Sequence, residues 1–233
     1  MKPIALIMLM ISSLYLGCME KDNLDKMKGK TYTYLALGDS YTIGEGVEES
    51  ERYPNQAVEI LKSKNLIFEK PLIIAKTGWT TDELDKGIED AGIEGKTYDL
   101  VTLLIGVNNQ YRGRPISDYE IEFQKMLTKA IQFAKGDPKH VLVISIPDWG
   151  VTPFAETRGT DRKNIAKEID DCNAAKERIS IQLGVHYIDI TEEYRKIGAL
   201  PEMVVEDKLH PSALVYKSWS EKFVKVVLDK MEF

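Results

Sequence analysis

The residues with the clearest chemistry are a serine near the start of the chain and an aspartate–histidine pair near its end. Ser40 closes the run LALGDS, and Asp207 and His210 are separated by two residues. A serine hydroxyl is a poor nucleophile until a neighbouring base removes its proton, and that base needs a third group to fix its tautomer. We therefore interpret Ser40 as a nucleophile, His210 as its base and Asp207 as the carboxylate that orients the base.

Acyl transfer also needs hydrogen-bond donors at the place where the oxyanion forms. The candidates are the backbone N–H groups of Ser40 and Gly78 and the side-chain amide of Asn108. Each of these residues also suits a simpler role, because serine, glycine and asparagine are frequent in turns and loop caps. Their functional interpretation therefore depends on whether the fold brings them together.

The chain offers few other nucleophiles or bases. His140 directly precedes an apolar run, which places it at the far end of a sheet, and His186 lies inside another apolar run. Cys172 belongs to a stripe with helical spacing and is interpreted as a small core residue. His210 stands on a loop before a proline, so it is the histidine best placed to serve Ser40.

Strand and helix patterns alternate along the chain. Five mostly apolar runs suit strands that are buried on both faces of a parallel sheet: Tyr32–Leu37, Leu72–Ala75, Leu100–Ile105, Val141–Ile146 and Val185–Ile190. Such alternation predicts a doubly wound α/β sandwich, in which ligands bind at the carboxyl ends of the strands. Ser40, Gly78 and Asn108 directly follow the first three runs, so the predicted fold and the predicted chemistry agree.

The helical patterns between these runs have apolar stripes and recognisable starts. We predict a helix beginning near Pro54, a second after a capping box of Ser117 and Glu120, and two more over Asp161–Leu183 and Ser212–Met231.

Composition limits the class of protein. The chain has 233 residues, of which 43% are apolar and 29% charged, and this is typical of a soluble globular domain with a full core. Its net charge of −6 argues against a nucleic-acid partner, because such partners favour a basic face.

The N-terminus has the pattern of an export signal. Lys2 precedes an apolar run over residues 4–16 that is too short for an ordinary membrane span, and Gly17-Cys18 resembles a bacterial lipobox, although Tyr15 stands where an aliphatic residue is usual. We expect a signal peptide at 1–17, a polar tether at 18–30 from a lipidated Cys18, and a single domain at 31–233. The protein would then be extracytoplasmic and anchored in the cell envelope; plain secretion or a periplasmic location is the alternative, and a retained anchor a further one. Lipidation of Cys18 would leave Cys172 without a disulfide partner.

The four blocks Gly38-Asp39-Ser40, Gly78, Gly106-x-Asn108 and Asp207-x-x-His210 resemble those of the SGNH (GDSL) hydrolase family, in the same order. The resemblance implies a flavodoxin-like three-layer α/β/α sandwich with a five-stranded parallel sheet, and a serine hydrolase that needs no metal or cofactor. It assigns Ser40 as nucleophile and oxyanion donor, with Gly78 and Asn108 as further donors. It also assigns His210 as the base and Asp207 as the carboxylate that orients it. One position departs from the pattern: Asn109 stands where the family usually has an aspartate, which leaves open what supports the loop there.

The expected reaction is the hydrolysis of carboxylic esters through an acyl-enzyme on Ser40. Loops 109–115 and 148–158 follow the third and fourth strands and carry aromatic side chains that could line an acyl pocket, stack on a sugar or pack onto the core. We expect short- to medium-chain acyl esters or O-acetyl sugars as substrates. The alternatives are a lysophospholipase or thioesterase, a carbohydrate O-acyltransferase on the same site, and an envelope protein that binds its ligand without catalysis. The expected partner is a small-molecule, glycan or lipid ester, with membrane contact only through the lipid anchor.

Overall fold

A five-stranded parallel sheet is the centre of the fold. The computed structural model describes residues 30–233, and its main sheet has the strand order β4-β2-β5-β6-β7, with every neighbouring pair parallel. The strands are β2 (Tyr34–Gly38), β4 (Leu72–Ala75), β5 (Leu100–Leu104), β6 (Val141–Ile144) and β7 (His186–Ile188). The predicted parallel sheet and α/β fold class are confirmed.

The first predicted strand is divided in two. Thr31–Tyr32 forms β1, which pairs with β3 (Ile67–Phe68) in a separate small sheet, and the chain enters β2 only after Thr33. The backbone N–H and the hydroxyl of Thr33 both donate to Oδ2 of Asp99, at 2.8 and 2.9 Å. This side chain takes the place of a ladder partner, so the apolar run continues while the strand is interrupted.

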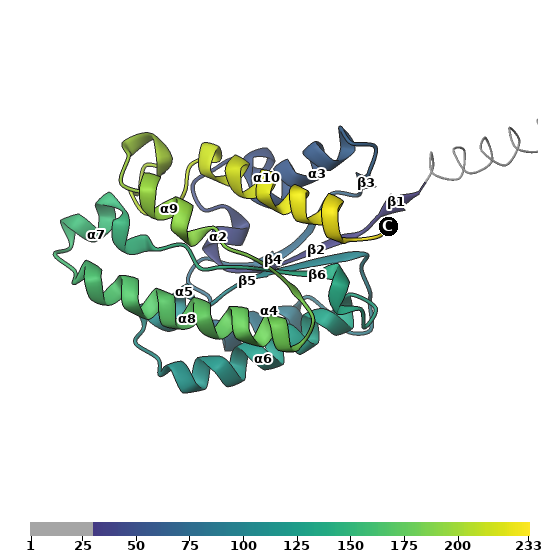
Figure 1. Ribbon diagram of the computed structural model, residues 1–233, viewed down its shortest axis with the longest axis horizontal. Helices are drawn as coiled ribbons and strands as arrows, with labels where there is room; N and C mark the ends of the chain where they lie inside the picture. Colours follow the sequence, from purple (N-terminus) through teal and green to yellow (C-terminus); the bar gives the residue numbers. More distant parts are fainter. Residues whose placement is uncertain (1–29) are drawn as a thin grey trace, which may run out of the picture. The chain divides into compact units, whose positions relative to one another are not determined.

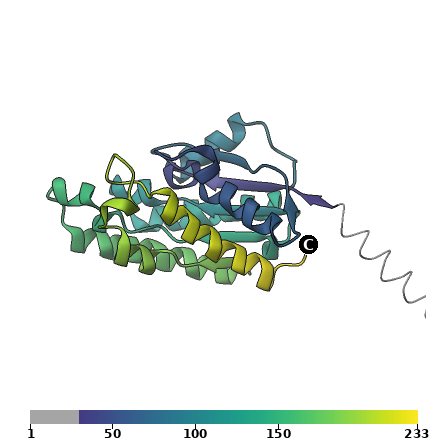
Figure 2. The ribbon, with the colours of Figure 1, turned by 90° about the horizontal axis from the view of Figure 1, so that it is seen from above.

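Helices cover both faces of the sheet (Figure 1). One face carries α3 (Tyr53–Lys62), α9 (Thr191–Ile197) and α10 (Ala213–Lys230), and the other carries α4 (Thr81–Asp90), α5 (Val107–Tyr111), α6 (Ile116–Phe133) and α8 (Arg162–Gln182). In the view from above, α10 lies beside α3 (Figure 2), and Ser220 Oγ donates to Tyr53 O at 3.0 Å between them. The three-layer sandwich is thus formed.

Short elements occupy the ends of the strands. They are α2 (Ser40–Ile43), α7 (Pro153–Thr157) and 3-10 turns at Glu49–Glu51, Pro138–His140, Trp149–Val151 and Pro201–Met203.

The predicted capping box at Ser117 is wrong. Helix α6 begins at Ile116 with Pro115 as its N-cap, so Ser117 already lies inside the first turn, and Glu120 pairs with Arg178 of α8 at 2.7 Å. Proline fixes its own φ near the value that a helix start requires, which moves the start forward. A capping box does form at α4, between Thr80 and Glu83.

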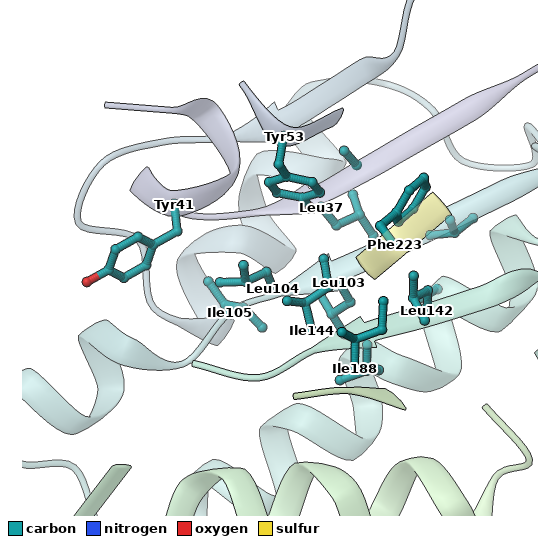
Figure 3. Close-up of a cluster of buried hydrophobic side chains, with 14 of the residues drawn as sticks. Leu37, Tyr41, Tyr53, Leu103, Leu104, Ile105, Leu142, Ile144, Ile188 and Phe223 are labelled. Atoms are coloured by element: carbon teal, nitrogen blue, oxygen red, sulfur yellow. The ribbon is translucent and has the colours of Figure 1, made fainter. Parts of the chain in front are cut away.

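The core lies between the sheet and its helices. Leu37, Leu103 and Leu142 from three adjacent strands pack with Tyr53 of α3 and Phe223 of α10, all fully buried (Figure 3). Burial on both faces explains why the strands are mostly apolar along their length.

The register aligns the carboxyl ends of β2, β4 and β5. Gly38, the last residue of β2, pairs with Ala75 of β4 on one side and Leu104 of β5 on the other. The chain therefore leaves three adjacent strands at the same level, and the residues that follow meet at one edge of the sheet.

Residues Tyr32–Phe233 form one compact unit. The predicted signal peptide and most of the tether, including Cys18, fall outside the described residues, and their boundaries stay predictions. Over residues 30–233, no helix combines the length and the apolar character needed to cross a bilayer.

Candidate active site

A cavity of about 190 Å³ opens at the carboxyl ends of the strands. Its lining residues come from segments far apart in the sequence: Ser40, Tyr41, Thr77, Gly78, Val107, Asn108, Tyr111, Trp149, Phe154, Leu209 and His210. The residues predicted from the sequence as nucleophile, base and oxyanion donors all line this one cavity, and the predicted orienting carboxylate, Asp207, contacts it through His210.

Ser40 is the first residue of α2, directly after the turn that ends β2. The N-cap of α2 is Asp39, whose Oδ1 accepts a hydrogen bond from the N–H of Tyr41 at 3.1 Å. The first N–H groups of a helix have no intrahelical partner, so the N–H of Ser40 is available to a ligand. Ser40 is 4% exposed, and its Oγ makes no hydrogen bond to any residue between 30 and 233. A serine–base hydrogen bond in such sites often forms only when the substrate is bound.

Asp207 and His210 form the predicted pair. His210 Nδ1 donates to Asp207 Oδ2 at 2.5 Å, while Asp207 Oδ1 accepts the backbone N–H groups of Leu209 and His210 at 2.8 and 2.9 Å. With Nδ1 donating, Nε2 remains as the acceptor that a general base requires. The turn places Lys208 at φ 64°, in the left-handed region.

The carboxylate is held in its charged form. Burial on its own would raise the pKa of Asp207, but the hydrogen bonds from the ring and backbone of His210 and from Leu209 outweigh it and lower the pKa below its ordinary value. Asp207 therefore stays ionised and can stabilise a positive charge on His210.

The two further oxyanion candidates lie on adjacent loops. Gly78 follows β4 at φ 86°, a conformation that side chains rarely adopt. Asn108 lies in α5, directly beyond β5, and its Nδ2 donates to the carbonyl of Trp79 at 2.9 Å. An amide nitrogen has two protons, so a second one remains for an oxyanion in the cavity.

Asn109, the departure from the family pattern, has a structural role. Its Oδ1 accepts the N–H of Thr81 at 3.1 Å, and its Nδ2 donates to Thr81 Oγ1 at 2.6 Å and to Glu122 Oε2 at 3.1 Å. The amide therefore joins the start of α4 to α6, and its donor side faces a carboxylate that an aspartate at this position would repel.

Three aromatic side chains form one wall of the cavity. The rings of Tyr111 and Phe154 pack edge-on against Trp149, with centroids at 5.3 and 6.3 Å. The indole N–H of Trp149 donates to Gln110 Oε1 at 2.9 Å, which fixes the ring. The N–H of Phe154 donates to the carbonyl of Lys208 at 3.0 Å, so this wall is joined to the loop of the base. The expectation that loops 109–115 and 148–158 flank the site is confirmed.

The sequence interpretation missed two buried charged residues beneath the site. Lys176 of α8 is fully buried, and its Nζ donates to the carbonyls of Ile144 and Ile105 at 2.6 and 3.2 Å, where β6 and β5 end. Burial lowers the pKa of Lys176 to about 7, although the nearby Asp39 opposes this; burial likewise raises the pKa of Asp39 to about 7. Lys176 lies on the same stripe as Cys172 and Ile179, which was the signal that could have revealed it.

The remaining candidates lie away from the cavity. Cys172 is a free, buried thiol, and burial raises its pKa to about 11, so it is neutral and unsuited to attack. His140 Nδ1 donates to the carbonyl of Asp99 at 2.8 Å, and the residue precedes the start of β6. No group of three metal-ligating side chains is found among residues 30–233.

Comparison with known proteins agrees with this geometry. The sequence pattern of the GDSL-like Lipase/Acylhydrolase family matches residues 36–217. No curated protein matches the sequence.

Solved structures of low sequence identity have the same fold. An acetylxylan esterase from Geobacillus stearothermophilus is 16% identical, with a TM-score of 0.66 over 86% of this chain and 96% of the esterase. A psychrotrophic esterase from Pseudoalteromonas is 16% identical, with a TM-score of 0.63 over 85% of this chain and 100% of the other. A lipase/acylhydrolase from Enterococcus faecalis is 18% identical, with a TM-score of 0.63 over 86% and 97% of the two chains. With the family blocks, the sheet and the cavity all in place, the chain belongs to the GDSL-like lipase/acylhydrolase family and is a carboxylic ester hydrolase.

Proposed function

We propose that the protein hydrolyses short- to medium-chain acyl esters or O-acetylated sugars through an acyl-enzyme on Ser40. The observation that carries the proposal is the shared cavity, which joins a nucleophile, a base with its orienting carboxylate, and three oxyanion donors. This arrangement supports the role proposed for each residue.

The reaction proceeds in two steps. His210 Nε2 takes the proton of Ser40 as Oγ attacks the ester carbonyl, and the oxyanion is stabilised by the N–H groups of Ser40 and Gly78 and the amide of Asn108. The C–O bond to the alcohol breaks, and the alcohol leaves with the proton from His210. Water, deprotonated by the same imidazole, then attacks the acyl-enzyme and releases the acid and free Ser40.

The size and lining of the cavity support small acyl groups. A volume of about 190 Å³ is below the roughly 300–1,000 Å³ of sites that enclose drug-sized ligands. Trp149 and Phe154 give one wall an apolar surface, which suits an alkyl chain of few carbons, and an aromatic face also suits the apolar side of a sugar ring. The esterase from Geobacillus that shares this fold acts on acetylxylan by its name, which is compatible with an acetyl-sugar substrate here.

A nucleophile test is direct. The wild type should react with a fluorophosphonate probe and release p-nitrophenol from p-nitrophenyl acetate; Ser40→Ala should do neither, and Ser63→Ala, at an exposed helix end, should behave as the wild type. Retention of esterase activity by Ser40→Ala would remove Ser40 as the nucleophile. Absence of both labelling and ester turnover in the wild type would favour the non-catalytic binding protein.

Acyl-chain length tests the substrate class. Across p-nitrophenyl acetate, butyrate, octanoate and palmitate, we expect kcat/KM to fall by about 10-fold or more for each chain segment that the cavity cannot enclose. Acetylated xylose and a sugar acceptor, assayed together, separate hydrolysis from acyl transfer by their products. A preference for palmitate or for lysophospholipid would contradict the short-chain proposal.

We also propose that the mature protein is extracytoplasmic and anchored in the cell envelope by a lipid on Cys18. The proposal rests on the sequence of residues 1–18, which lie outside the described part of the chain. In a bacterial host, metabolic labelling with an alkyne fatty acid should mark the wild type and not Cys18→Ser. Equal labelling of both, or of neither, would contradict lipidation at this residue.

A further inference from the structure

The segment that carries one oxyanion donor is held mainly by side chains of α4 and α5, beside a backbone hydrogen bond from the N–H of Trp79 to the carbonyl of Lys76 at 3.2 Å. Over four consecutive residues, Gly78 O accepts from Arg112, Trp79 O accepts from Asn108, Thr80 N–H donates to Glu83, and Thr81 N–H donates to Asn109. Three of these four partners belong to α5 or its C-cap, and α5 carries the other oxyanion donor, Asn108.

The side of Gly78 on which a side chain would lie is open. If a Cβ were built there, the one heavy atom within 4 Å of it, chain neighbours aside and within residues 30–233, would be Nη2 of Arg112, at 3.9 Å. Gly78 also has φ 86°, and a glycine in a turn has more freedom than any other residue. The position of its N–H therefore depends on the hydrogen bonds of the segment, and the shortest of the four is the one from Arg112.

Arg112 is hydrogen-bonded both to the segment that carries Gly78 and to the helix that carries Asn108. Its backbone N–H donates to the carbonyl of Asn108 at 3.1 Å, so the two residues share one helical turn. Its Nη2 reaches Gly78 O at 2.7 Å, and its Nη1 and Nη2 pair with the two carboxylate oxygens of Glu83 at 3.2 and 3.1 Å. Glu83 in turn accepts the N–H of Thr80 at 3.0 Å. One planar guanidinium thus joins the loop after β4, the start of α4 and the end of α5.

We propose that Arg112 is a positioning residue that keeps the N–H of Gly78 and the amide of Asn108 at the separation and orientation that the oxyanion requires. The inference rests on the proposed function of these two donors. Arg112 does not line the cavity, so its effect on catalysis passes through Gly78 and Asn108. Preorganised donors contribute to the rate only while their geometry is fixed. Loosening the segment that carries one donor should therefore lower kcat, and should weaken substrate binding less.

The chain offers a closely matched control. Arg114 lies two residues further on and pairs with Asp82 at 2.6 Å, also at the start of α4, but it contacts neither Gly78 nor Asn108. Arg112→Met removes the partly exposed ion pair with Glu83, and Arg114→Met removes those with Asp82 and, at 3.7 Å, Glu122, so the control should cost at least as much stability as the test variant. Only the first removes the hydrogen bond to Gly78 O.

The experiment compares these variants with the wild type on p-nitrophenyl acetate. Arg112→Met should lower kcat by about 10-fold or more, a part of the roughly 10²–10³-fold loss expected when a whole donor is removed. Its KM should stay within about twofold, and Arg114→Met should retain both constants. Arg112→Lys should recover little, because an ammonium cannot match the planar fork. Added guanidinium should partly restore Arg112→Ala. Equal kcat values for Arg112→Met and Arg114→Met would overturn the proposal.

A second measurement needs no turnover. In ¹H–¹⁵N spectra, the backbone amide of Gly78 and the side-chain amide of Asn108 should shift or broaden in Arg112→Met and remain unchanged in Arg114→Met. If the wild type hydrolysed no ester, the proposed function would fail, whereas these spectra would still decide whether Arg112 positions the two donors. Unchanged amides in Arg112→Met would refute the positioning role irrespective of any activity.

Discussion

The buried lysine beneath the site gives a sharp test of the electrostatics of this fold. Lys176→Met keeps the length of the side chain and removes its amine. Desolvation by burial lowers the pKa of Lys176 to about 7, with Asp39 opposing it, whereas a lysine in an unfolded chain titrates near about 10.4. Between these values the unfolded state binds a proton that the folded state has released, so the contribution of Lys176 to stability rises with pH.

The size of the effect follows from proton linkage. One proton difference changes the free energy of unfolding by about 1.4 kcal/mol per pH unit. From pH 7 to 9, the free energy of unfolding of the wild type should therefore increase by up to about 3 kcal/mol relative to that of Lys176→Met. Asp39 adds to the same trend. Its pKa is already raised by burial and lowered in part by Lys176, so without the lysine it rises further, and the variant loses stability as the pH passes 7.

Urea unfolding followed by tryptophan fluorescence at pH 7, 8 and 9 measures this difference. Lys167→Met is the matched control, since Lys167 lies on the same helix, is exposed, and pairs with Asp171 at the surface. Its difference from the wild type should not depend on pH over this range. If the difference for Lys176→Met were also constant, the lysine would keep its proton as the partner of an ionised Asp39, and the reasoning would be refuted.

Three further predictions concern the loops around the cavity. Asn109→Asp should lower the free energy of unfolding by about 1–3 kcal/mol, because its carboxylate would meet that of Glu122, and Glu122→Gln should restore most of the loss; an additive double variant in urea unfolding would argue against this contact. Gly106→Ala should destabilise the protein by more than about 1 kcal/mol, since Gly106 has φ 125° and a Cβ would lie 2.4 Å from the hydroxyl oxygen of Tyr119; a thermal midpoint equal to the wild type would contradict this. Asp207→Asn should lower kcat by up to about 10⁴-fold while the fold is kept, and an unchanged kcat would show that His210 needs no orienting carboxylate.

The sequence was sufficient for the fold class because the strands are buried on both faces. A run such as Leu100–Ile105, apolar except for Thr102, has few alternatives to a central parallel strand, and the structure has a strand over Leu100–Leu104. Local detail was less predictable. Thr33 leaves the first strand because Asp99, 66 residues away, takes its hydrogen bonds, and no local pattern contains that partner.

The same distinction holds within the site. Ser40, Gly78, Asn108 and His210 were recognisable because each follows a strand or belongs to a short motif, and they meet in one cavity. Their supports were not recognisable. The contact of Arg112 with Gly78 spans 34 residues, and it depends on how two loops approach each other in space.

The hydrogen bonds between α3 and α10 have a consequence for biosynthesis. Gln56 Nε2 donates to Ala213 O at 3.1 Å, and Ser220 Oγ donates to Tyr53 O. Helix α3, which is synthesised early, therefore binds α10, which is synthesised late, and the loop with His210 directly precedes α10. In the proposed mechanism, a nascent chain has its nucleophile, Ser40, long before the ribosome adds its base, His210. Hydrolysis of a chromogenic ester should therefore be seen only from chains made at least as far as His210, which makes it a test of the late assembly of the site.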